Sequence, residues 1–364
     1  MKHIVLFINT LSSGGAEHQL VQLADGLVKR GYKVTIATFG DADDHYSYDS
    51  AIQRQRIAPK KANVIKMFSI WCYFLTLKAD CVIAFGQRES RYMLEGLSLR
   101  PFHKIRCIAG DRNTTYGFPS HTEQILMKHL YKKADFIVPN SQAQLKHIVL
   151  SSPGYQNKTV CITNYTNLSS FNVTPLPNGS TTRIGVFARY AHQKNCLLFV
   201  EAINTLKQQS KFPFIVEWFG NIRIKGSTNP YYLQVKEKVE EYDLCNEFIL
   251  HDHVKDVAGC MPLFDAICLP SLYEGFSNSI SEAICCGKPC IVSDVADNSV
   301  MVHHQENGFL FNPSQLDSIV KAFNDFLCLS VEERNRMSKA SRKIAESLFD
   351  YERFVSSYVN LIEA

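Results

Sequence analysis

Two glutamates eight residues apart, Glu274 and Glu282, lie on either side of a predicted helix N-terminus. The apolar stretch 264–269 predicts a strand, and apolar residues at helical spacing follow within 280–287. Free N–H groups of a first helical turn, together with the helix dipole, form a site that suits a phosphate. Carboxylates beside a bound phosphate are better explained as partners of sugar hydroxyls than as partners of the anion. The stretch therefore predicts a sugar-nucleotide site.

Two cations five residues apart, Arg189 and Lys194, follow another predicted strand at 184–188. An arginine presents a planar fork of donors and a lysine a point charge, so the two can converge on a diphosphate. Exposed arginines and lysines are mostly solvated, and alone this pair would be a weak signal. Together with the glutamate motif it favours neutralisation of a diphosphate.

The two glutamates, with the segment 283–289 that follows them, resemble the glutamate-x7-glutamate signature of retaining family 4 glycosyltransferases. That family has the GT-B fold, in which two Rossmann-like α/β domains face each other across a cleft and a C-terminal helix crosses back. Family members also carry the arginine and lysine pair, usually after a glycine where this chain has Ala188. The resemblance extends to enzymes of bacterial surface-polysaccharide assembly.

The resemblance implies a role for each motif residue. Arg189 and Lys194 would stabilise the leaving diphosphate, Glu274 would hold the sugar hydroxyls, and Glu282 would hold the ribose. These roles make Glu274, Arg189 and Lys194 the predicted catalytic residues, and no general base is assigned. The predicted donor-binding residues are Gly15, Gly220, His253, Gly275, Phe276, Ser277, Asn278, Ser279 and Glu282.

The predicted acceptor-binding residues lie in the first half of the chain. Gly14 belongs to a Gly-Gly loop between a strand and a helix, where a simple tight turn is the alternative interpretation. Asp111, Arg112 and Asn113 follow the predicted strand 105–109, and polar residues past the carboxyl end of a strand are where open α/β sheets place ligands. A turn stabilised by Asp and Asn remains the alternative there.

The elements that must position these residues alternate between strand and helix patterns, which predicts parallel sheets. A chain of 364 residues exceeds what one core usually fills. A polar linker at 166–182 separates a first domain, 1–165, from a second, 166–349, and 350–364 should pack back on the first. The predicted strands are 4–8, 34–39, 81–85, 105–109, 136–138, 160–162, 184–188, 214–219 and 264–269, and residues 248–253 resemble the family segment whose backbone meets the nucleotide base. The predicted helices are 16–30, 60–77, 197–207, 280–287, 317–327, 331–348 and 351–362.

Composition indicates a globular protein, with 46% hydrophobic and 20% charged residues. The first three residues lead straight into an apolar strand, so we expect no signal peptide and a cytoplasmic protein. Twelve scattered cysteines without a Cys-x-x-Cys pair favour buried thiols over zinc ligands. Asp41 and Asp43 form an Asp-x-Asp pair in a polar loop, where solvation is favoured over metal binding. We expect no metal, no cofactor and no nucleic-acid partner.

The charge of the chain is divided unevenly. Residues 1–165 hold 21 Lys and Arg against 12 Asp and Glu, whereas residues 166–364 hold 18 against 23. A basic first domain suits an anionic acceptor or membrane surface, although a solvated basic face is the simpler interpretation. The region expected to touch an anionic membrane contains Arg54, Arg56, Lys60, Lys61 and Lys66 beside Phe68, Trp71 and Phe74, and a core helix with solvated flanks is its alternative.

The predicted function is transfer of a hexosyl or N-acetylhexosaminyl group from a nucleotide diphosphate sugar, expected to be UDP-linked, with retention of configuration. The resemblance implies an acceptor hydroxyl on a glycan or on a lipid-linked glycan at the inner face of the membrane. Three alternatives remain: a nucleotide-sugar epimerase, a sugar phosphorylase of the same fold, or a noncatalytic partner subunit. The sugar, the base, the acceptor, the linkage and the oligomeric state are not fixed by the sequence.

Overall fold

The computed structural model describes residues 1–364 except residues 13, 58–62, 101–104, 113–127, 178 and 225. The chain divides into two compact units. Unit 1 contains Met1–Tyr165 and Tyr351–Ala364, and unit 2 contains Thr166–Asp350. Each unit is built around a parallel sheet with helices on both faces, which confirms the predicted α/β fold class.

The sheet of unit 1 has six parallel strands within the described residues. In spatial order they are β3 (Gln53–Arg56), β2 (Lys33–Thr38), β1 (His3–Ile8), β4 (Cys81–Phe85), β5 (Arg106–Asp111) and β6 (Phe136–Pro139). Its helices are α1 (Gly15–Lys29), α2 (Asn63–Thr76), α3 (Gln87–Ser98), α5 (Gln142–Ser151) and α13 (Tyr351–Glu363). The order of strands along the chain reverses between β1 and β4, and open α/β sheets bind ligands at such a point.

Alternation along β1 divides the core of unit 1 between the two faces of the sheet. Ile4, Leu6 and Ile8 belong to the cluster that contains buried residues of α1 and α13. Val5 and Phe7 belong to the cluster with buried residues of α2 and α3. Side chains of a strand point to opposite faces in turn, so a continuous apolar strand can be buried on both sides.

The C-terminal helix α13 belongs to unit 1, although the segment before it lies in unit 2. Buried side chains such as Phe354 and Tyr358 join the α1 cluster. The Arg106 guanidinium donates to the carbonyl oxygens of Leu361 and Ile362, at 3.2 and 2.6 Å. The predicted C-terminal crossover helix is therefore confirmed.

The sheet of unit 2 repeats the same order within the described residues. Its strands are β11 (Phe248–His251), β8 (Phe214–Phe219), β7 (Thr182–Phe187), β12 (Ala266–Leu269), β13 (Cys290–Ser293) and β14 (Gly308–Phe311). A hairpin of β9 (Arg223–Ile224) and β10 (Ser227–Thr228) follows β8. The helices are α6 (Cys196–Gln209), α7 (Pro230–Glu241), α8 (Val257–Cys260), α9 (Asn278–Cys285), α10 (Asn298–Met301), α11 (Leu316–Leu327) and α12 (Val331–Leu348).

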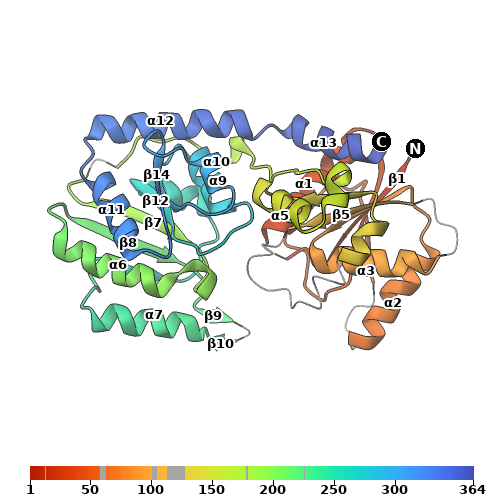
Figure 1. Cartoon of the computed structure of the whole chain (residues 1–364), viewed down its shortest axis with the longest axis horizontal. Coiled ribbons are helices and arrows are strands. Elements are labelled where there is room, and N and C mark those ends of the chain that lie inside the picture. The colour runs from red at the N-terminus through yellow and green to blue at the C-terminus, as the bar shows by residue number, and fades with distance from the viewer. Residues whose placement is uncertain (13, 58–62, 101–104, 113–127, 178, 225) are drawn as a thin grey trace. The chain divides into compact units, whose positions relative to one another are not determined.

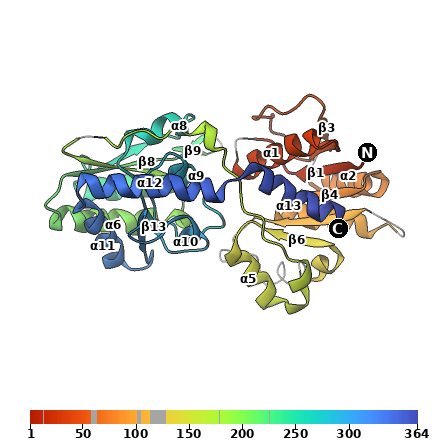
Figure 2. The same cartoon turned by 90° about the horizontal axis from the view of Figure 1, so that it is seen from above.

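Two groups of helices cover the sheet of unit 2. Helices α6, α7 and α11 lie on one face, whereas α9, α10 and α12 lie on the other (Figure 1). The view from above shows α12 lying along the sheet (Figure 2). The order of strands reverses between β7 and β12, so the loops after these two strands meet at the carboxyl edge of the sheet.

The structure corrects several predicted elements. Residues 160–162 form no strand, because Pro139 of β6 has no N–H to complete a ladder and only an isolated bridge remains between Ile137 and Thr159. Strand β5 extends to Asp111, which was expected in a loop. Strands β3, β11, β13 and β14, the β9–β10 hairpin, and helices α3, α5, α7, α8 and α10 were not predicted.

Candidate active site

The carboxyl ends of β7 and β12 bring the two predicted motifs of unit 2 together. Strand β12 pairs in parallel with β7, with Cys268 opposite Val186. Arg189 and Lys194 follow β7, and Glu274 follows β12. Segments about 80 residues apart in the chain therefore share one edge of the sheet.

Lys194 and Glu274 form a salt bridge between the two loops, in which Lys194 Nζ donates to Glu274 Oε1. Only 13% of the Lys194 side chain and 9% of the Glu274 side chain are exposed. A charge removed from water in this way is stable only with its partner or with a replacement of the same sign. The pair therefore places one cation and one carboxylate, side by side, at the predicted diphosphate and sugar position.

Gln193 ties the same two loops together through its backbone and its side chain. Its carbonyl oxygen accepts from Leu272 N at 2.9 Å, and its Nε2 donates to the Tyr273 oxygen at 3.0 Å. Arg189, whose side chain is exposed, reaches Gln193 Oε1 at 3.4 Å. These contacts hold the loop of Lys194 against the loop of Glu274, while the Arg189 guanidinium remains accessible to a ligand.

Helix α9 begins with no side-chain cap at Ser277. The Ser277 hydroxyl instead donates to Asn298 Oδ1 at 2.7 Å, in a buried contact. A serine at this position normally accepts from the N–H groups of the second or third helical residue. Ser277 therefore does not cap the first turn of α9, which contains the predicted donor-binding residues Asn278 and Ser279.

Glu282 lies on α9, five residues past the N-cap Ser277, and its side chain is only partly exposed. Burial raises the pKa of Glu282 to about 7. Within the described residues its carboxylate has no hydrogen-bond partner. A half-buried carboxylate of this kind gains from hydroxyl donors that a ligand brings, which fits the predicted ribose contact.

The other predicted donor residues of unit 2 have different surroundings. Gly220 is required by close packing, because a Cβ there would collide with the Ala188 carbonyl oxygen. His253 is exposed, and its backbone N–H donates to Asp252 Oδ1 at 2.8 Å. Phe276 is buried and packs edge-on against Phe349.

The predicted Gly-Gly loop of unit 1 forms the start of α1. Gly14 is the N-cap in an extended conformation, and Gly15 is the first helical residue. The Tyr46 hydroxyl donates to the Gly14 oxygen at 3.2 Å, and a Cβ at Gly14 would collide with the Glu17 carboxylate. The loop is therefore a strand-to-helix turn, as the alternative interpretation has it. It lies at the carboxyl edge of the sheet, and its role in ligand binding remains a prediction.

Asp111 and Arg112 make internal contacts that the sequence did not reveal. Asp111 is buried and accepts from the Tyr131 hydroxyl at 2.8 Å. Arg112 donates to Asn164 Oδ1 at 2.8 Å and to the Tyr358 hydroxyl at 2.7 Å. These bonds tie the end of β5 to α13, which is a structural role beside the predicted acceptor role. Asn113 lies outside the described residues.

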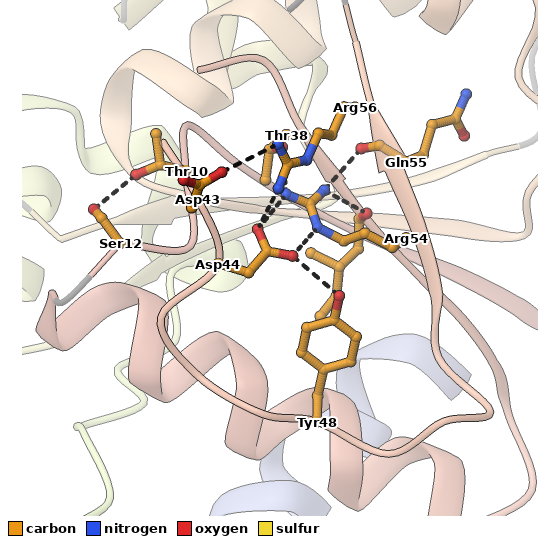
Figure 3. A network of polar contacts seen from close by, with 10 residues as sticks. Thr10, Ser12, Thr38, Asp43, Asp44, Tyr48, Arg54, Gln55 and Arg56 are labelled. Atoms are coloured by element: carbon orange, nitrogen blue, oxygen red, sulfur yellow. Dashed lines mark hydrogen bonds and ion pairs between the residues drawn. The ribbon is translucent and has the colours of Figure 1, made fainter. Parts of the chain in front are cut away.

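The expected membrane-facing cations are partly neutralised by neighbouring carboxylates. Figure 3 shows Asp44 accepting from Arg54 through both oxygens, at 2.9 Å each. The Arg54 guanidinium holds the pKa of Asp44 below its usual range. Lys66 pairs with Asp41 at 3.2 Å. Arg54 and Lys66 are therefore structural ion-pair partners, and Lys60 and Lys61 lie outside the described residues.

The described residues were expected to hold no metal ion, and their cysteines to be thiols. Among the described residues no group of three His, Cys, Asp or Glu side chains is placed to hold a metal ion. The twelve cysteines are free thiols, and burial raises the pKa of Cys107 and Cys286 to about 12. No helix in the described part of the chain has the length and apolar character needed to cross a bilayer.

Two family models match the chain, one in each unit. Residues 13–168 match the model described as glycosyltransferase family 4, and residues 174–344 match the model described as glycosyl transferases group 1. Together the two matches cover most of the chain.

Individual relatives are distant. A 28% identical match to the UDP-Gal:alpha-D-GlcNAc-diphosphoundecaprenol alpha-1,3-galactosyltransferase of Escherichia coli covers 40% of this chain and only 38% of that enzyme. The O-antigen chain mannosyltransferase C of Escherichia coli is 22% identical over 96% of this chain and 94% of its own length. The structure of Anabaena Alr3699/HepE in complex with UDP and glucose superimposes with a TM-score of 0.81, at 17% identity, over 100% of both chains. This last likeness concerns the fold alone.

The raised pKa of Glu282 predicts a stability change of definite sign. The folded state holds the Glu282 proton up to about pH 7, whereas an unfolded glutamate loses it near its ordinary pKa of 4.5. Ionisation over that interval therefore destabilises the fold. We expect Glu282→Gln to melt at a higher temperature than the wild type at pH 8, with the difference shrinking toward pH 5.

Thermal unfolding between pH 5 and pH 8 tests this, with the exposed Glu237→Gln as the matched control. Equal melting temperatures of Glu282→Gln and the wild type across the whole pH range would contradict the assignment.

Proposed function

The chain belongs to the family 4 glycosyltransferases, and we propose that it transfers a hexosyl or N-acetylhexosaminyl group from a UDP-sugar to an acceptor hydroxyl with retention of configuration. The observation that carries this proposal is the meeting of Lys194, Glu274 and the uncapped N-terminus of α9 at one edge of unit 2. A UDP-linked donor is supported by the name of the Escherichia coli galactosyltransferase and by the UDP in the HepE structure.

The proposed division of labour follows the charges. A diphosphate at the N-terminus of α9 competes with Glu274 for Lys194, and Arg189 has an exposed guanidinium to add a second cation. Once released from Lys194, the Glu274 carboxylate accepts hydrogen bonds from sugar hydroxyls. Glu282, for which the described part of the chain offers no hydrogen-bond partner, accepts from the ribose.

The chemical step breaks the bond between the anomeric carbon and the β-phosphate oxygen. The acceptor oxygen bonds to that carbon on the same face, and its proton passes to the departing phosphate, which leaves as UDP. Negative charge grows on the diphosphate as the bond breaks, so the cations and the helix N-terminus stabilise the transition state more than the ground state.

We propose a lipid-linked glycan acceptor at the inner face of an anionic membrane. The named acceptor of the Escherichia coli relative supports it, as does the surface of α2. Four apolar side chains of that helix are exposed: Val64 by 81%, Ile65 by 52%, Phe68 by 65% and Leu75 by 38%. They recur at helical spacing and form an apolar stripe, whereas Phe74, expected at the membrane, is buried in the core. Apolar insertion thus replaces most of the expected cation contact.

The first prediction concerns the two cations. Lys194→Ala and Arg189→Ala should each reduce turnover at least ~10²-fold, the scale of losing one group that stabilises developing charge. The matched control is Lys238→Ala, which removes a comparable salt bridge to Glu201 between α7 and α6. Product analysis with UDP-sugars measures the effect. Turnover in both site variants equal to that of Lys238→Ala would exclude the diphosphate role.

The second prediction separates the two glutamates. Glu282→Gln should weaken UDP binding at pH 8, because a ribose hydroxyl loses an ionised acceptor, a contact worth ~1.5–3 kcal/mol. Glu274→Gln should retain or improve UDP affinity, since Lys194 no longer has a competing carboxylate, yet lose sugar transfer. Calorimetric titration with UDP decides between the two. Equal losses of UDP affinity in both variants would contradict the assignment.

The third prediction concerns the membrane. Ile65→Ser combined with Phe68→Ser should weaken flotation with anionic liposomes, because each large apolar side chain contributes ~1.5–3 kcal/mol when buried. Leu150→Ser provides the control, since that leucine is 80% exposed on α5 of the same unit. High salt should also reduce flotation. If the wild type never floats, or if the α2 variant floats like Leu150→Ser, a water-soluble acceptor replaces the lipid-linked one.

A further inference from the structure

The turn that carries Arg189 is held on both sides by buried neighbours. Ala188 donates from its backbone N to the Phe219 oxygen at 3.1 Å and accepts from Trp218 Nε1 at 2.7 Å. Tyr190, which is 2% exposed, follows on the other side. The Arg189 side chain is exposed, but the residues on both sides of it are fixed. The main chain of Arg189 therefore has a set position before any ligand binds.

The hold on Tyr190 comes from Asn229, a residue 39 positions later and only 3% exposed. Asn229 Nδ2 donates to the Tyr190 oxygen at 3.0 Å and to the Asn221 oxygen at 3.2 Å. Its Oδ1 accepts from Tyr231 N at 3.0 Å and so caps α7. The side chain thus joins the Arg189 turn, the end of β8 and the start of α7.

The same network continues to the end of β11. The Tyr190 hydroxyl lies 2.9 Å from the Trp218 oxygen and 2.8 Å from the His251 oxygen. Asn229 also closes the base of the β9–β10 hairpin, because its backbone N donates to the Ile222 oxygen at 2.7 Å. Trp218 and His251 lie near the carboxyl ends of β8 and β11, and Ile222 lies in the loop after β8.

We infer that Asn229 is a positioning residue for the diphosphate contact of Arg189. The inference rests on the proposed function and adds to it a residue that touches neither the sugar nor the phosphate. The position requires an amide, since it must donate twice and accept once. An aspartate keeps the cap on Tyr231 N but turns a carboxylate toward the carbonyl oxygens of Tyr190 and Asn221. Such repulsion displaces the turn without disturbing α7.

The test compares UDP with uridine, since only UDP carries the diphosphate. Calorimetric titration of Asn229→Asp should show UDP binding weakened about tenfold, the loss of roughly one charge-assisted contact, with uridine affinity within about twofold of the wild type. Asn229→Ser, which retains a short capping hydroxyl, provides a second variant should the aspartate prevent folding. Asn307→Asp is the matched control, because Asn307 is buried and donates to the Met301 oxygen at the opposite edge of the sheet.

A double-mutant cycle with Arg189→Ala distinguishes positioning from a general loss of structure. If Asn229 acts through Arg189, adding Asn229→Asp to Arg189→Ala should cost no further UDP affinity beyond about twofold. The positioning role would be overturned if the losses of UDP affinity in the two single variants multiplied in the double variant. It would also be overturned if Asn229→Asp lost affinity for UDP and uridine equally, or if it bound UDP as well as Asn307→Asp does. A wild type that prefers UDP no more than uridine would overturn the proposed function itself.

Discussion

A lysine and a glutamate that are both shielded from water must stay paired or gain other partners. This requirement determines what can bind at the carboxyl edge of the sheet of unit 2. Lys194 and Glu274 are exposed by only 13% and 9%. Removing one partner of such a pair leaves an uncompensated charge, which is far more costly than the pair is stabilising. A ligand that separates them must therefore bring an anion for Lys194 and hydroxyl donors for Glu274. A sugar diphosphate brings both.

The fold supplies the meeting place for this pair. Because β7 and β12 are neighbours where the strand order reverses, their following loops converge, and Gln193 fastens one loop to the other. Unit 1 has the same strand order, and the loop at Gly14 follows its own reversal point. There, however, Arg112 bonds to Asn164 and to α13, so part of the edge serves the structure. Function therefore depends on side chains placed on a shared scaffold.

The sequence predicted what is local and missed what is contributed by distant segments. Glu282 and the α9 N-terminus followed from a strand, a loop and a helix in continuous order, and the α/β class followed from repetition of that pattern. The bond from Gln193 to the Tyr273 backbone joins residues 80 positions apart and has no local signal. Arg54 was expected to touch an anionic membrane, and nothing in the sequence marks Asp44 as its partner. Residues 160–162 have the composition of a strand, but they form no ladder with β6 because Pro139 lacks an N–H.

When the donor binds, its diphosphate should take the place of Glu274 beside Lys194. A crystal structure of the protein with UDP tests it most directly. We expect phosphate oxygens within hydrogen-bonding distance of Lys194 Nζ and of the first-turn amides of α9, with the Glu274 carboxylate released from the lysine. UDP bound elsewhere, or bound here while Lys194 stays on Glu274 without a phosphate contact, would contradict it.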